Sequence, residues 1–220
     1  MGEILAIVYK ELLSELRTRY SLSNILLFIF TTISMIAISY SSEKISLETS
    51  AGLLWIVLFF TSMIGLSKSF ITEEERGTAL FLQVIANSYS IYFGKLIFNI
   101  LTSLFINFFA LTFFFLFVNT QVVRSVSLLI MTIGISSLAI ATATTVISAI
   151  IAKANSKNAL FPVLAFPILL PIIKIGIDLT VASFVGSTIK ENLGDIQMMV
   201  AYSGLVATVS YLLFDFIWKD

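Results

Sequence analysis

The sequence contains no cysteine and no histidine, and only 12% of its 220 residues carry a charge. Without cysteine the chain forms no disulfide, binds no zinc through thiolates and offers no thiol nucleophile. Without histidine it lacks the side chain that most often ligates metals and transfers protons near neutral pH. No cluster of acidic residues occurs in the apolar segments either. Together these three absences argue against an enzyme.

The charge that is present is sparse and balanced. Apolar residues make up 58% of the chain, and its mean hydropathy is +1.02. A soluble domain is about 45–50% apolar and about 25% charged, so this composition indicates an integral membrane protein. The 13 basic and 13 acidic residues cancel, and a nucleic-acid partner is not expected because such proteins carry a basic surface.

The apolar residues gather in runs long enough to cross a bilayer, which takes about 20 residues of helix. The sequence predicts an all-α integral membrane protein with six transmembrane helices in a single domain, residues 1–220. Of the 26 charged residues, only Lys174 and Asp178 fall inside the six windows, as the cost of charge in lipid requires. The windows are 25–41, 51–67, 96–118, 127–151, 160–184 and 196–214.

The basic residues of the loops and tails are distributed unequally between the two sides of the membrane. Because cytoplasmic loops are enriched in lysine and arginine, both termini are expected to be cytoplasmic. Three cations lie on the other side: Lys44, Arg124 and Lys190. Nine lie on the side of the termini: Lys10, Arg17, Arg19, Lys68, Arg76, Lys95, Lys153, Lys157 and Lys219.

Residues 3–20 precede the first span and have the pattern of an amphipathic helix lying on the membrane surface. No signal-peptide cleavage pattern follows them. A short soluble cap is the alternative interpretation. The apolar positions are Leu5, Val8, Leu12 and Leu16, and the polar positions are Lys10, Ser14, Arg17 and Thr18.

The segment 68–95 is the longest stretch on the side of the termini and contains the sequence TEEERGT. Thr72 and Glu75 have the spacing of a capping box, which predicts a short helix with three carboxylates in its first turn. Gly77 interrupts this helix, and Thr78 begins a second apolar stretch. A solvated connector between two spans is the alternative interpretation, but a flexible linker needs neither a cap nor a glycine break.

Three motifs resemble those of the CcmB family, the permease subunit (heme exporter protein B) of the cytochrome c maturation ABC transporter. They are Ala51-Gly-Leu-Leu-Trp55 at the second span, Glu73–Thr78 after it, and Pro167-x-x-x-Pro171 in the fifth. Length, span number and topology also agree, so the resemblance covers nearly the whole chain. It implies an ABC exporter permease fold in the bacterial cytoplasmic (inner) membrane.

The resemblance also implies a set of partners and a mechanical role. No G-x-x-x-x-G-K-[ST] pattern occurs in the sequence, so ATP must bind another polypeptide. This chain is then a non-catalytic subunit with no directly bound cofactor, and heme is carried by partner proteins. The expected partners are a second copy of the chain, an ABC ATPase (CcmA-like), a heme-binding membrane subunit (CcmC-like), a small membrane subunit (CcmD-like) and a periplasmic heme chaperone (CcmE-like).

In this interpretation the ATPase pushes on the acidic segment, and spans two and three carry the movement into the membrane. The expected coupling residues are Glu73, Glu74, Glu75, Arg76, Gly77 and Thr78. The complex either exports heme or uses ATP to release the loaded chaperone. Release is favoured, because the sequence has no histidine or cysteine to ligate heme iron.

Polar residues recur within the spans at helical spacing. Lys95, Asn99, Ser103 and Asn107 form a stripe along the third span, expected to face the bundle or a dimer seam. Packing is favoured over a substrate path for this stripe. A stripe of small residues in the fourth span is expected to serve close helix packing: Ser137, Ala141, Thr145 and Ala149.

All three prolines, Pro162, Pro167 and Pro171, fall in the fifth span, where each removes a helix donor and favours a kink. Lys174 and Asp178 lie four residues apart and can neutralise each other. We expect a kinked span over 160–173 followed by a short re-entrant pair over 174–192. One long tilted helix with an internal ion pair is the alternative.

Two other functions are compatible with these features. One is a permease of the same architecture that exports another substrate, such as a drug, a lipid or a glycan. The other is an ion-coupled carrier that acts alone. Such carriers usually place carboxylates near the middle of the membrane, and Asp178 is the only candidate here.

Overall fold

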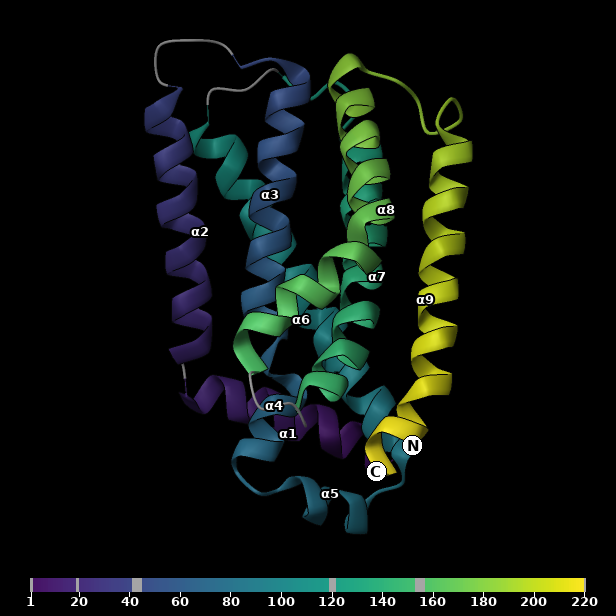
Figure 1. The fold of residues 1–220 in the computed structure, drawn as a ribbon. Coiled ribbons are helices and arrows are strands. Elements are labelled where there is room, and N and C mark those ends of the chain that lie inside the picture. Colours follow the sequence, from purple (N-terminus) through teal and green to yellow (C-terminus); the bar gives the residue numbers. More distant parts are fainter. Residues whose placement is uncertain (1, 19, 41–44, 119–121, 153–156, 220) are drawn as a thin grey trace.

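The computed structural model describes residues 2–18, 20–40, 45–118, 122–152 and 157–219, and this part of the chain is helical throughout its regular structure (Figure 1). Three of the cations from which the membrane orientation is predicted lie outside the described residues: Arg19, Lys44 and Lys153. The helices are α1 (Gly2–Thr18), α2 (Tyr20–Ser39), α3 (Leu47–Leu66), α4 (Lys68–Glu75), α5 (Ala79–Ile85), α6 (Ser88–Phe117), α7 (Val126–Ala152), α8 (Lys157–Val185) and α9 (Leu193–Lys219).

Six of these helices are long and apolar enough to cross a membrane, which confirms the predicted number of spans: α2, α3, α6, α7, α8 and α9. These six helices form a bundle. Both chain termini and the helices α1, α4 and α5 lie at the same end of it (Figure 1). This end is called the terminal end below. The third span begins earlier than predicted, at Ser88, because the Asn87 side chain caps it by accepting a hydrogen bond from Ser90 N at 2.7 Å.

Helix α7 lies at the centre of the bundle and packs against α3, α4, α6, α8 and α9. The small-residue stripe predicted to serve helix packing is buried along its length: Ser137, Ala141, Thr145 and Ala149. Its hydroxyl groups donate to carbonyl oxygens one turn back, as Thr145 does to Ala141 O at 2.6 Å. The buried hydroxyl groups of α7 therefore have partners without water, as a bilayer interior requires.

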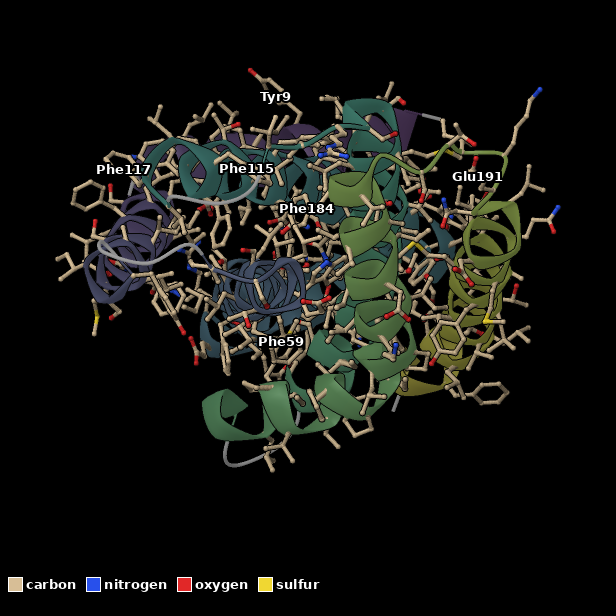
Figure 2. The ribbon with its side chains drawn as sticks, turned by 90° about the horizontal axis from the view of Figure 1, so that it is seen from above. Tyr9, Phe59, Phe115, Phe117, Phe184 and Glu191 are labelled. Carbon is tan, nitrogen blue, oxygen red and sulfur yellow. The ribbon has the colours of Figure 1, made fainter. Side chains whose placement is uncertain are left out.

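The amphipathic helix predicted over residues 3–20 is present as α1, and it lies across the terminal end of the bundle (Figure 1). Its buried apolar side chains are Ile7 and Val8, and Ile7 packs against Gly94 of α6. The exposed apolar residues lie on the opposite side, where Figure 2 shows Tyr9 pointing away from the bundle. They are Leu5, Tyr9, Leu12, Leu13 and Leu16. This exposed apolar face suits contact with lipid.

Helix α8 corrects the expectation of a re-entrant pair over residues 174–192. It is one continuous helix that contains all three prolines and ends at Val185. Its first part runs obliquely and its second part runs along the bundle (Figure 1). Proline removes a single hydrogen bond and bends a helix whose neighbours hold it in place. The chain therefore crosses once here, and residues 186–192 connect α8 to α9.

The second half of α8 packs against the predicted motif tryptophan of α3. The Trp55 indole is 1% exposed, and its Nε1 donates a hydrogen bond to Thr180 Oγ1 at 3.0 Å. Gly176 allows this approach, because a Cβ at that position would lie 2.0 Å from the indole ring. Trp55 and Gly176 thus determine how closely α3 and α8 pack.

Candidate coupling site at the terminal end

Helix α4 places the acidic residues differently from the sequence expectation. Ser67 is both the C-cap of α3 and the N-cap of α4, so the chain passes from one helix into the next with a single intervening residue. Thr72 therefore lies inside α4, and the predicted helix start at Thr72 is wrong. Glu73, Glu74 and Glu75 form the last turn of α4, the end where the helix dipole disfavours negative charge.

The glycine break after α4 is a Schellman turn. Gly77 has φ of +67°, a left-handed conformation that glycine adopts without steric cost. Its N–H donates to Glu74 O at 3.1 Å, and the Thr78 N–H donates to Glu73 O at 2.9 Å. These two bonds close the end of α4 and direct the chain into α5.

The Glu73 carboxylate lies inside an ionic network instead of facing outward. Its Oε1 accepts hydrogen bonds from Lys10 Nζ of α1 and from Lys95 Nζ of α6, the latter at 3.3 Å. Its Oε2 accepts a hydrogen bond from Thr78 Oγ1 at 2.5 Å. Glu11 of α1 completes the network, with Oε1 2.7 Å from Lys95 Nζ and 3.1 Å from Lys10 Nζ. Two carboxylates and two ammonium groups thus join α1, α4 and α6.

Lys95 is the most buried member of this network, with a fully buried side chain. Its ammonium group also donates to Ser69 O at 2.5 Å and lies 4.9 Å from the centre of the Phe70 ring. A buried charge is tolerated only when it is paired and hydrogen-bonded. For Lys10, burial alone lowers the pKa, but the Glu11 and Glu73 carboxylates outweigh this effect and hold the pKa above its ordinary value.

The rest of the predicted stripe along α6 also faces the bundle interior. Asn99 Nδ2 donates to Thr145 Oγ1 of α7 at 2.8 Å. Asn107 Nδ2 donates to Ser137 Oγ of α7 at 2.9 Å, and its Oδ1 accepts from Ser62 Oγ of α3 at 3.0 Å. The structure therefore joins Lys95, Asn99, Ser103 and Asn107 in one buried polar seam between α6 and its neighbours. These bonds hold α6 against α3 and α7.

Helix α5 carries an exposed apolar surface that the sequence interpretation did not include among the coupling residues. It is the lowest element at the terminal end in Figure 1. Its inner side chains, Ala79 and Leu82, are buried, and Gln83 Nε2 donates to Trp218 O of α9 at 2.5 Å. The outer side chains are exposed by 56–86%: Leu80, Phe81, Val84 and Ile85. In the sequence, the apolar run directly after Gly77 indicates this apolar surface.

The six predicted coupling residues are thus divided among different surroundings. Glu73 is buried in the ionic network and Thr78 is bonded to it, whereas Glu74 and Glu75 are exposed at the end of α4. Arg76 is exposed but lines a cleft with residues of α1. Within the described residues, no group of three or more acidic side chains is arranged to hold a metal ion.

The network predicts that Lys95→Met destabilises the protein by about 3 kcal/mol, because two carboxylates lose their buried counter-ion. The change is measured as a lower thermal unfolding midpoint of the purified protein in detergent. Lys68→Met is the matched control, because Lys68 is exposed at the start of α4. Adding Glu11→Gln to Lys95→Met should restore part of the loss. Equal midpoints for Lys95→Met and Lys68→Met would contradict the assignment.

Comparison with known proteins agrees with this architecture. The family model described as CcmB protein matches residues 2–214 of the 220. No curated protein matches the chain. The matched range includes the first five spans, most of the sixth and the whole of the segment from α4 to α5. The chain therefore belongs to the CcmB family of multi-pass membrane proteins, the heme exporter permease subunits of cytochrome c maturation.

Proposed function

We propose that this chain is the permease half of an ABC transporter complex and that its ATPase subunit docks on α5 and the end of α4. The observation that carries the proposal is the exposed apolar surface of α5: Leu80, Phe81, Val84 and Ile85. Exposed apolar surface of this kind marks a protein contact when it lies outside the lipid. Glu74 and Glu75 are exposed at the end of α4, and Glu75 lines one cleft together with Phe81 and Ile85 of α5.

The ionic network gives a route by which a push on α5 reaches the membrane. Thr78 is the N-cap of α5 and is bonded to Glu73, which is bonded in turn to Lys95 of α6. Gln83 holds the other half of α5 to the end of α9. The ATPase would therefore move α5 together with two spanning helices. ATP itself binds the ATPase subunit, because this sequence has no P-loop.

Docking of the ATPase requires the terminal end of the bundle to be cytoplasmic. The excess of basic residues at this end supports that orientation, and the membrane is then the bacterial inner membrane. We propose the remaining partners that the family implies: a heme-binding membrane subunit (CcmC-like), a small membrane subunit (CcmD-like) and a periplasmic heme chaperone (CcmE-like). An ion-coupled carrier is disfavoured, because Asp178, the single acidic residue within the predicted span windows, is paired with Lys174.

The ion pair on α8 supports a homodimer whose interface includes this helix. Lys174 Nζ lies 2.6 Å from Asp178 Oδ1, yet the two side chains are 67% and 49% exposed. Charged side chains within a span usually face protein or water instead of lipid. A two-fold axis along the bundle brings the same face of both copies together. Lys174 of one copy can then pair with Asp178 of the partner subunit, and Leu170 lies on the same exposed stripe.

We propose that ATP hydrolysis releases the heme-loaded chaperone and does not move heme through this subunit. The absence of histidine and cysteine supports this, because they are common ligands of heme iron.

The docking surface predicts that Phe81→Ser combined with Val84→Ser weakens binding of the co-expressed ATPase subunit at least about tenfold. Each buried apolar side chain of this size is worth about 1.5–3 kcal/mol, and 1.4 kcal/mol is a factor of ten. Binding is measured by titrating the purified subunits in nanodiscs. The control is Val122→Ser, a valine of similar exposure (80% against 86% for Val84) beyond the opposite end of the bundle. Unchanged ATPase affinity in the double variant would refute docking on α5.

The dimer interface predicts that Leu170→Cys forms a disulfide between two copies under mild oxidation. The natural chain has no cysteine, so each introduced thiol can react only with its copy. A disulfide requires Cβ atoms about 3.5–4.5 Å apart, which only a close interface provides. Leu212→Cys is the control, because Leu212 is exposed on α9. Cross-linking at residue 212 and none at residue 170 would place the interface elsewhere.

The release mechanism predicts no ATP-dependent heme transfer across vesicles that contain the complex without the chaperone. When heme-loaded chaperone is bound to the same vesicles, ATP should release the chaperone from the complex. The released chaperone should appear in solution on the side of the membrane where it was bound. Heme absorbance and chaperone sedimentation measure the two outcomes. Rapid ATP-dependent heme flux without chaperone would contradict this mechanism and favour heme export.

A further inference from the structure

We propose that the cleft between α1 and the turn after α4 binds the phosphate group of an anionic phospholipid. The cleft has a volume of about 510 Å³. Three of its five lining side chains are cationic, and none is acidic: Lys10, Leu13, Ser14, Arg17 and Arg76. Phosphate is the anion that guanidinium groups bind best, because they form two parallel hydrogen bonds to it.

The fold, and not the sequence, brings these cations together. Lys10 and Arg17 are seven residues apart, which places them two turns apart on one flank of α1. Arg76 is the C-cap of α4 and comes from a distant part of the chain. The bond between Lys10 and Glu73, three residues before Arg76, holds the two segments next to each other. The convergence of the three cations therefore depends on the packing of α1 against α4.

The nearby carboxylates leave the two arginines available. Glu11 and Glu73 are already bonded to Lys10 and Lys95. Glu15 and Glu75 line the adjoining cleft of about 750 Å³, which shares Lys10, Ser14 and Arg76 with the smaller one but not Arg17. Within the described residues neither Arg17 nor Arg76 forms an ion pair. An anion in the smaller cleft would thus contact two arginines without displacing a carboxylate.

The position of the cleft favours a lipid over a free anion. Helix α1 lies across the end of the bundle with its exposed apolar face directed outward, as Tyr9 shows in Figure 2. Such a helix lies at the level of the lipid headgroups. Leu13, which lines the cleft, is also one of the exposed apolar residues of α1. A phospholipid can therefore place its phosphate between the arginines and its acyl chains along α1.

Lipid binding would tie the coupling segment to the membrane surface through Arg76. The binding itself does not depend on the proposed function, because it requires only α1, the turn after α4 and a bilayer. Anionic headgroups attract basic side chains near a membrane by about 1 kcal/mol each, and two bidentate arginines add specificity to this attraction.

The test measures retention of phosphatidylglycerol by the full-length protein with native mass spectrometry, after exchange from phosphatidylcholine nanodiscs containing graded amounts of it. The variant is Arg17→Gln combined with Arg76→Gln. The control is Arg124→Gln combined with Lys190→Gln, which removes two cations beyond the opposite end of the bundle. We expect the first variant to bind phosphatidylglycerol about tenfold more weakly, and the control to bind it like the natural protein.

Thermal unfolding midpoints accompany the measurement, and both variants should unfold like the natural protein because the four side chains are exposed. Equal lipid loss in both variants would show unspecific electrostatic attraction and overturn the proposal. Inorganic phosphate at tens of millimolar is added to a parallel sample. Displacement of phosphatidylglycerol by phosphate alone would identify a site for free anions and also overturn it. Retained lipid in the presence of phosphate supports a phospholipid site.

Discussion

The buried ammonium group of Lys95 is the interaction on which the terminal end of this protein depends. It lies between the carboxylates of Glu11 and Glu73, and the Lys95 side chain is fully buried. A charge in such surroundings requires its counter-ions to remain in place. The positions of α1 and α4 against α6 are therefore linked, and α5 follows from them through Thr78.

Neutral polar groups within the spans are also bonded inside the protein. The amides of Asn99 and Asn107 donate to hydroxyl groups of α7, and those hydroxyl groups donate onward to helix carbonyls. A polar atom in a bilayer must find its partner within the protein. The seam between α6 and α7 thus aligns the helices laterally, while the ionic network aligns their ends. Lys95 belongs to the same face of α6 as Asn99 and Asn107, so the ionic network and the polar seam meet at this residue.

Three exposed surfaces of the described residues differ in chemistry. The outer face of α5 is apolar and lies beyond the bundle, as suits a protein partner in water. The exposed face of α8 combines apolar side chains with the pair Lys174–Asp178. The cleft beside α1 is cationic. The ionic network borders the first and the third surface, because Glu73 is bonded both to Thr78 at the start of α5 and to Lys10 in the cleft.

The sequence by itself determined the membrane class, the six spans, the amphipathic first helix and the inward polar stripe, because each follows from composition or helical periodicity. Family membership also agreed with motifs visible in the sequence. Only the tertiary structure decided that α3 runs into α4, that α8 stays continuous through three prolines, and that Arg76 faces α1. These outcomes depend on contacts between distant segments: Glu11, the partner of Lys95, is 84 residues away. Local propensity contains no information about such a contact, so it could not show which carboxylate would be buried and which apolar face would stay exposed.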